Sequence, residues 1–229
     1  MKEEKTRKSV CTYCGEYCVV TRDHVFSRGL FNKPLPTDPV MVDSCSNCNE
    51  MYSLDEEFIR TIIAARATFA PEGKQLWRHV VSSSFGRSPK FKSSISELVE
   101  MAEVTKGNIY LGDVPALVLR DDEIKRLKKV ICKIIRGLYR HHFSQILPSN
   151  YKIISHMLDD AYLFDNLDDP ILKIVWPKVG KTYTVGGERV QYRYRISEEQ
   201  EEISVWSILF YGRVLMYAIV YPEHMEEQF

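Results

Sequence analysis

Two cysteine pairs near the N-terminus constrain this chain more than any other feature of its sequence. Cys11 and Cys14 form one Cys-x-x-Cys pair, and Cys45 and Cys48 form the other. Each pair places two thiolates on one tight turn, and two such turns supply the four sulfur ligands of a tetrahedral zinc site. A redox pair or four buried thiols would be the alternatives, but neither explains the paired spacing. The spacing therefore predicts a structural Zn²⁺ site.

Other features of the sequence bear on the cellular location of the protein. Two further cysteines, Cys18 and Cys132, lie outside the pairs. The first ten residues are charged and lack the apolar core of a secretory signal, so a disulfide framework is not expected. The apolar stretch from Trp206 to Pro222 is too short and too interrupted to cross a bilayer. These observations predict a cytoplasmic protein with no membrane partner.

The insert between the two pairs is 30 residues long, which exceeds the spacer of about 15–20 residues in a zinc ribbon. It opens with a strand rich in β-branched residues that ends in Asp23 and His24. A second apolar run at 40–42 leads back to the second pair, which Asn49 follows directly. A helical pattern begins after it. The predicted order is cysteine pair, strand, Asp-His, loop, strand, cysteine pair and helix.

This order resembles the HNH nuclease superfamily, whose core is a two-stranded ribbon and a helix around a metal. The resemblance covers roughly residues 8–62 and rests on the two cysteine pairs, on Asp23-His24 and on Asn49. It implies a metal-dependent endonuclease that hydrolyses phosphodiester bonds in DNA. His24 would be the general base that activates water, and Asp23 and Asn49 would hold a catalytic Mg²⁺ or Mn²⁺. The four cysteines would hold structural zinc.

The residue types suit that chemistry. Imidazole titrates near neutral pH, so His24 can accept a proton from water. The side-chain oxygens of Asp23 and Asn49 are hard ligands of the kind that Mg²⁺ and Mn²⁺ prefer. The alternatives are a polar pair at a strand end for Asp23 and His24, and a helix cap for Asn49. The resemblance also implies an Asn before the second strand that orients the histidine; this chain lacks it, and the nearest polar candidate is Asp38.

Two further charged groups near this motif carry predictions of their own. Asp55, Glu56 and Glu57 follow the second cysteine pair. We interpret these acids as residues that favour the N-terminal end of a helix through its dipole, with a further metal ligand as the alternative. Arg22, directly before the Asp-His pair, is a candidate contact to a phosphate.

The net charge of the chain is zero, but the charge is unevenly distributed. Residues 1–60 carry a balance of −2, residues 61–140 one of +7 and residues 141–229 one of −5. Much of the positive charge lies on a helix predicted over 121–147, whose apolar side chains form one face. The basic side chains expected on the opposite face are Lys125, Lys129, Lys133, Arg136 and Arg140. This face is a candidate DNA-binding surface, with a solvated helix face as the alternative.

The remaining sequence predicts helices followed by strands. A polar loop is expected at 82–94 and a short helix at 96–104. Two antiparallel strand pairs follow near the C-terminus, one turned at Gly186-Gly187 and one at Gly212. The expected fold class is α+β. It combines an N-terminal ββα-metal (HNH) module bearing structural zinc with helices and a C-terminal antiparallel β-sheet.

The expected organisation divides the chain into two parts. Residues 1–70 form the zinc-stapled nuclease module, and residues 71–229 form a helical plus antiparallel-sheet accessory domain for recognition or assembly. DNA is the expected partner, with a partner protein as a second ligand of the accessory domain. Two other functions fit the same sequence: a non-catalytic zinc-bearing module that binds nucleic acid or protein, and an RNA-directed nuclease.

Overall fold

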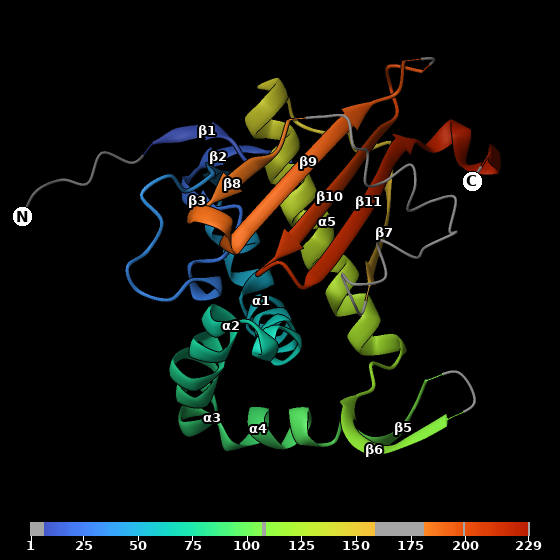
Figure 1. Cartoon of the computed structure of the whole chain (residues 1–229). Coiled ribbons are helices and arrows are strands. Elements are labelled where there is room, and N and C mark those ends of the chain that lie inside the picture. Colours follow the sequence, from blue (N-terminus) through green and yellow to red (C-terminus); the bar gives the residue numbers. More distant parts are fainter. Residues whose placement is uncertain (1–6, 107–108, 159–180, 199, 229) are drawn as a thin grey trace, which may run out of the picture.

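An antiparallel sheet forms the C-terminal part of the fold (Figure 1). The structure is a computed structural model that describes residues 7–106, 109–158, 181–198 and 200–228. Within them the sheet has five strands in the order β7-β11-β10-β9-β8. In chain order these are β7 (Tyr151–Leu158), β8 (Tyr183–Val185), β9 (Val190–Ile196), β10 (Ser204–Phe210) and β11 (Val214–Pro222). The two strand pairs predicted from the sequence, β8 with β9 and β10 with β11, are confirmed.

Helix α5 (Asp121–Phe143) packs on this sheet and crosses behind it in Figure 1. Its buried side chains recur at helical spacing and include Leu127, Ile131, Ile134 and Leu138. Three acidic residues occupy its first turn, where the positive end of the helix dipole favours them. Within the described residues, no helix is both long enough and apolar enough to cross a bilayer.

The N-terminal segment carries two short ribbons and one long helix. Strand β1 (Lys8–Val10) pairs with β2 (Tyr17–Val19), and β3 (Thr21–His24) pairs with β4 (Met41–Ser44), both antiparallel. Helix α1 (Ser46–Arg66) follows β4 almost directly. The predicted succession of strand, loop, strand and helix is therefore confirmed, and so is the mixed α+β composition of the chain.

Short helices and a hairpin fill the segment between α1 and α5, which lies at the bottom of Figure 1. They are α2 (Pro71–Leu76), a π-helical turn η3 (Trp77–Val81), α3 (Ser82–Arg87), α4 (Pro89–Ser96), β5 (Val99–Lys106) and β6 (Ile109–Leu117). The loop predicted at 82–94 is wrong, because Ser88 caps α4 by accepting a hydrogen bond from the Phe91 amide at 3.3 Å. The helix predicted at 96–104 is also wrong, because this stretch pairs as β5 with β6.

Four 3₁₀ segments complete the described secondary structure: η1 (Arg28–Leu30), η2 (Ala67–Phe69), η5 (Gly187–Arg189) and η6 (Glu223–Gln228).

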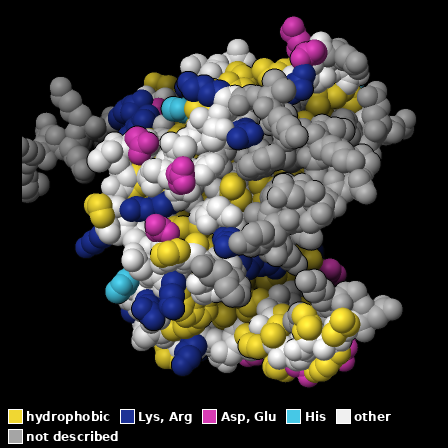
Figure 2. Space-filling model, in the orientation of Figure 1, with side chains coloured by type: hydrophobic (Ala, Val, Ile, Leu, Met, Phe, Trp, Pro, Cys, Tyr) yellow, Lys and Arg dark blue, Asp and Glu magenta, His cyan; other side chains and the backbone are white. Residues whose placement is uncertain are grey.

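Hairpin β5–β6 exposes several large apolar side chains to solvent. Its exposed apolar side chains include Met101, Ile109, Tyr110 and Leu111. Figure 2 shows apolar side chains gathered over this hairpin at the lower end of the molecule.

One continuous cluster of buried side chains joins the N-terminal and C-terminal segments. It runs from Val25 after β3 through Phe58 of α1 and Ile135 of α5 to Trp206 of β10. Gly137 allows the close approach of α5, because a Cβ at this position would lie 2.6 Å from a methyl carbon of Val25. Residues before and after position 70 thus share one hydrophobic core.

His142, in the last turn of α5, lies in an aromatic cluster on the sheet. Its ring lies 4.6 Å from the rings of Tyr183 and Tyr194, and its Nε2 lies 3.1 Å from the Tyr192 hydroxyl. Burial, followed by the charges of His141 and Lys181, lowers the pKa of His142 from 6.5 to about 4. The folded state therefore holds this imidazole in its neutral form.

This environment predicts an acid-sensitive contribution to stability. Between pH 6.5 and 4 the unfolded chain binds a proton at His142 that the folded chain does not, so the free energy of unfolding should fall as the pH falls through this range. We expect the variant His142→Phe to show a weaker pH dependence in urea titrations at pH 7, 5.5 and 4.5. The variant His79→Phe supplies the control, because this histidine is exposed and lies outside the aromatic cluster, so it should retain the wild-type dependence. Equal slopes for all three proteins would contradict this assignment.

Candidate functional site

The four paired cysteines come together at the junction of β1, β4 and α1. The sulfur atoms of Cys11, Cys14, Cys45 and Cys48 all lie within 4.8 Å of one another. Tetrahedral coordination with Zn–S bonds of about 2.3 Å places sulfur atoms roughly 3.8 Å apart, and the Cys14 and Cys45 sulfurs lie 4.0 Å apart. The cluster can therefore hold a metal ion such as zinc.

Backbone amides prepare these sulfurs for a cation. The Cys45 amide donates to the Cys11 sulfur, and the Cys48 amide donates to the Cys45 sulfur, both at 3.4 Å. Burial acts to raise the pKa of Cys11, but hydrogen bonds from the amides of Cys14, Cys45 and Tyr13 outweigh it and lower the pKa to about 7. Because the thiolate is the form that binds metal, this shift favours coordination by Cys11, whereas burial raises the pKa of Cys14 and of Cys48.

Asp23 and His24, the pair at the end of β3, point in different directions. Successive residues of a strand face opposite sides, and here Asp23 is 8% exposed whereas His24 is half-buried. The His24 ring lines a cavity together with Arg28, which follows in η1. Burial, and then the charge of Arg28, lowers the pKa of His24 below its ordinary value.

The Asp23 side chain joins a buried cluster of charges. Its Oδ2 lies 2.9 Å from the Lys133 ammonium and accepts a hydrogen bond from the Tyr13 hydroxyl at 2.9 Å. Lys133 also contacts Glu56 Oε1 at 2.5 Å, and its side chain is 0% exposed. One lysine from α5 thus forms ion pairs with a carboxylate from β3 and with one from α1. Burial raises the pKa of Glu56, although the charge of Lys133 acts in the opposite direction.

This arrangement does not fit a divalent cation held by Asp23. A cation at its Oδ2 would lie beside the Lys133 ammonium, and the repulsion would weaken binding. Asn49 lies exposed in the first turn of α1. Among groups of three or more His, Cys, Asp or Glu in the described part of the chain, only the four-cysteine cluster has the geometry to hold a metal ion.

Helix α1 begins earlier than the sequence pattern indicates. Its N-cap is Cys45, whose sulfur accepts the Cys48 amide, so Asn49 is not the cap. Asp55 and Glu56 consequently lie well inside the helix, and the interpretation that they favour its N-terminal end is wrong. They face α5 instead.

The ion pairs between α1 and α5 explain why these acids are there. Asp55 accepts from Arg126 at 2.8 Å and from Lys129 at 2.7 Å, and Glu56 binds Lys133. Because these carboxylates form ion pairs with basic side chains of the neighbouring helix, they reduce the positive charge that these side chains can offer to a phosphate. Glu57 forms an ion pair with Arg60 within α1 at 3.1 Å.

The predicted basic face of α5 is therefore divided. Lys133 does not belong to it, because this residue is buried three positions after Val130 and four before Gly137, both buried. The spacing of Lys133 from Val130 and Gly137 places all three on one side of the helix, so the sequence contains a signal that Lys133 is buried. Arg136 donates to the Leu147 carbonyl at 3.3 Å, and Arg140 to the Ser144 carbonyl at 2.5 Å.

The other members of the face remain nearer to solvent. Lys125 is exposed and pairs with Asp122 at 3.0 Å, and Lys129 is partly exposed beside Asp55. Arg22 also keeps half of its side chain exposed while it contacts Asp43 and donates to the Met41 carbonyl at 3.0 Å. Phosphate contacts by these residues stay predictions.

Comparisons with known proteins add no family to this picture. Scans against protein-family models and searches of curated proteins and of solved structures gave no match to the chain. The features of the chain that bear on its function are the cysteine cluster, His24 with Arg28 at the cavity, and the buried Lys133.

We expect the cysteine cluster to bind one zinc ion per chain. The variant Cys48→Ser should lose the metal and unfold at a lower temperature, because zinc bound only by the folded state stabilises it. Elemental analysis and thermal unfolding with and without a chelator measure both effects. Cys132→Ser, outside the cluster, is the matched control and should retain the metal. Equal metal content in both variants would argue against the site.

Lys133 should be essential to stability. Replacing it with methionine leaves the buried carboxylates of Asp23 and Glu56 without compensation, which should cost about 3–5 kcal/mol at neutral pH. The loss should shrink in acid as Glu56, whose pKa is raised by burial, becomes neutral. Lys125→Met on the same helix removes an exposed ion pair and should change the free energy of unfolding by less than about 0.5 kcal/mol. Denaturant titrations compare the two, and similar losses would refute the buried cluster.

Proposed function

We propose that this chain is a nuclease that hydrolyses phosphodiester bonds in DNA, with His24 as the general base and zinc held by the four cysteines. One observation carries the proposal. His24 ends a strand of the β3–β4 ribbon, which leads directly into α1, and its half-buried ring faces a cavity beside a cationic side chain. The same order of ribbon, cysteine cluster and helix underlies the resemblance to HNH nucleases.

The chemistry follows from the two residues at the cavity. The lowered pKa of His24 keeps the imidazole neutral at pH 7, so that it can accept a proton from water as the water attacks phosphorus. The bond from phosphorus to the leaving sugar oxygen breaks, and that oxygen takes a proton from solvent. The Arg28 guanidinium carries a permanent positive charge that can stabilise the negative charge developing on the phosphate oxygens. Asp23 acts on His24 through its charge, from the opposite face of the strand.

The resemblance also implies a catalytic Mg²⁺ or Mn²⁺ held by Asp23 and Asn49. Lys133 already neutralises Asp23, so no step of the proposed mechanism passes through a cation at this carboxylate. The same observation favours a second function, in which the chain is a non-catalytic zinc-bearing module that binds nucleic acid or a protein. RNA is an alternative substrate, because a general base and a cationic side chain can act on a phosphodiester bond whether the sugar is ribose or deoxyribose.

We expect His24→Ala to lower the rate of cleavage by a factor of about 10²–10⁴, the usual contribution of a general base. The assay follows nicking of plasmid DNA and cleavage of RNA with Mg²⁺, with Mn²⁺ or with a chelator. Zinc content and thermal stability of the variant should match the wild type, because His24 contacts neither the cysteine cluster nor the Lys133 ion pairs.

His141→Ala is the matched control, since this exposed histidine lies on α5 away from the cavity. Wild-type activity in the His24→Ala variant would remove His24 from the mechanism. Binding of nucleic acid without cleavage by the wild-type protein would favour the non-catalytic module.

A further inference from the structure

A cavity of about 290 Å³ opens beside His24. This volume is near the lower end of the range of about 300–1,000 Å³ typical of sites for small organic groups. Phe26 and Phe31 contribute aromatic walls, and Val40 and Val185 contribute aliphatic ones. The polar side chains at its wall are His24 and Arg28. The cavity is therefore apolar inside, with a base and a cation at its edge.

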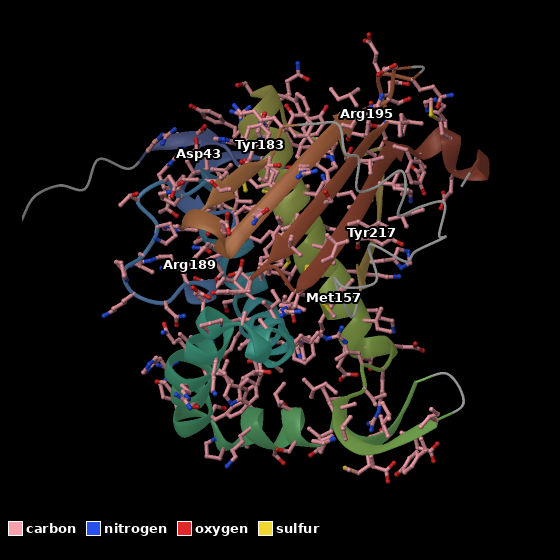
Figure 3. All side chains as sticks on the ribbon, in the orientation of Figure 1. Asp43, Met157, Tyr183, Arg189, Arg195 and Tyr217 are labelled. Atoms are coloured by element: carbon pink, nitrogen blue, oxygen red, sulfur yellow. The ribbon has the colours of Figure 1, made fainter. Side chains whose placement is uncertain are left out.

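The cavity walls are held in place by the C-terminal sheet. Arg189 lies in the turn before β9 (Figure 3). It donates to the carbonyl oxygens of Asn32 at 3.2 Å and Pro34 at 3.1 Å. The Tyr211 hydroxyl donates to the Leu30 carbonyl. These contacts fix the insert after β3 against strands that lie more than a hundred residues away in sequence.

The turn between β8 and β9 supplies a further contact. The Gly186 amide donates to Asp38 Oδ1 at 3.3 Å, so Asp38 holds the insert to the sheet. Gly186 has φ of +67°, and a Cβ there would lie 3.0 Å from Pro36 and 3.1 Å from Phe31. Because two cavity residues are packed this closely, the cavity is pre-formed, and binding does not carry the free-energy cost of ordering its walls.

We propose that this cavity receives one unpaired nucleobase of the substrate strand and thereby places the adjoining phosphate against His24 and Arg28. A planar aromatic base suits walls of phenylalanine, proline and aliphatic side chains, on which bases stack without sequence preference. Charge complementarity supports this occupant. Arg28 is exposed at the edge and, within the described residues, has no ion-pair partner of its own, which suits it to a phosphate.

This inference rests on the proposed nuclease function and narrows its substrate. A base in a duplex must leave its stack to enter the cavity, whereas a single-stranded or mismatched base does so at lower cost. The preferred substrates are therefore single strands and duplexes with unpaired nucleotides. Because the walls offer few hydrogen-bonding groups, the identity of the base should matter little.

The test compares a variant that fills the cavity with one that does not. Leu35 lines the cavity and is partly buried, whereas Thr37, two residues on in the same loop, is exposed and does not line it. Leu35→Trp fills the space, and Thr37→Trp is the matched control. Each is mixed with a single-stranded oligonucleotide that carries 2-aminopurine, whose fluorescence falls when the base stacks. The His24→Ala background prevents cleavage during this measurement.

In the shared His24→Ala background, we expect quenching when the other cavity residues are unchanged and with Thr37→Trp, and at least about a tenfold weaker affinity with Leu35→Trp. A second measurement needs no variant of the cavity. In the wild-type protein, an abasic nucleotide in place of the base next to the cleaved bond should slow cleavage at that bond at least about tenfold.

The failures can be told apart. Base-dependent quenching that Leu35→Trp abolishes, in a protein that cleaves nothing, would support the cavity and refute the nuclease. Cleavage that depends on His24 but proceeds equally on perfect duplexes and across abasic sites would support the nuclease and overturn this inference. Unchanged affinity in a folded Leu35→Trp variant would also overturn it, and would leave an apolar side chain of a partner protein as the occupant.

Discussion

A single buried ammonium group ties together the three elements on which the candidate site depends. Lys133 of α5 reaches Asp23 of β3 and Glu56 of α1, and its side chain is closed off from solvent. Removing three charges from water is costly, so this cluster is tolerable only because each carboxylate meets the lysine at close range and Tyr13 donates to Asp23. The position of the β3–β4 ribbon relative to both helices follows from this requirement.

The same cluster separates two neighbours that the sequence places together. Asp23 faces inward to Lys133, and His24 faces the cavity and Arg28. A strand forces this division, because adjacent side chains leave its two sides. The His24 ring thus remains at the cavity, where the proposed mechanism needs it, while Asp23 pairs with Lys133 and influences His24 through its charge.

The candidate site also belongs to both halves of the chain. The cysteine cluster stabilises the start of α1, but the cavity beside His24 depends on Arg189, Tyr211 and Gly186 from the C-terminal sheet. The sheet therefore contributes directly to the candidate site. It fixes the insert after β3, whose prolines and phenylalanines form the cavity.

The sequence by itself determined the local features of this protein. The spacing of the cysteine pairs predicted a four-sulfur cluster, since two short turns bring four thiolates together, and strand and turn patterns predicted the ribbon and the C-terminal hairpins. Only the tertiary structure decided what the charges do. Asp55, Glu56 and Lys133 are ordinary surface residues by type, and their pairing depends on how α1 packs on α5. Ion pairs between residues more than seventy positions apart leave no periodic signal in a sequence, because they arise from packing and not from local spacing.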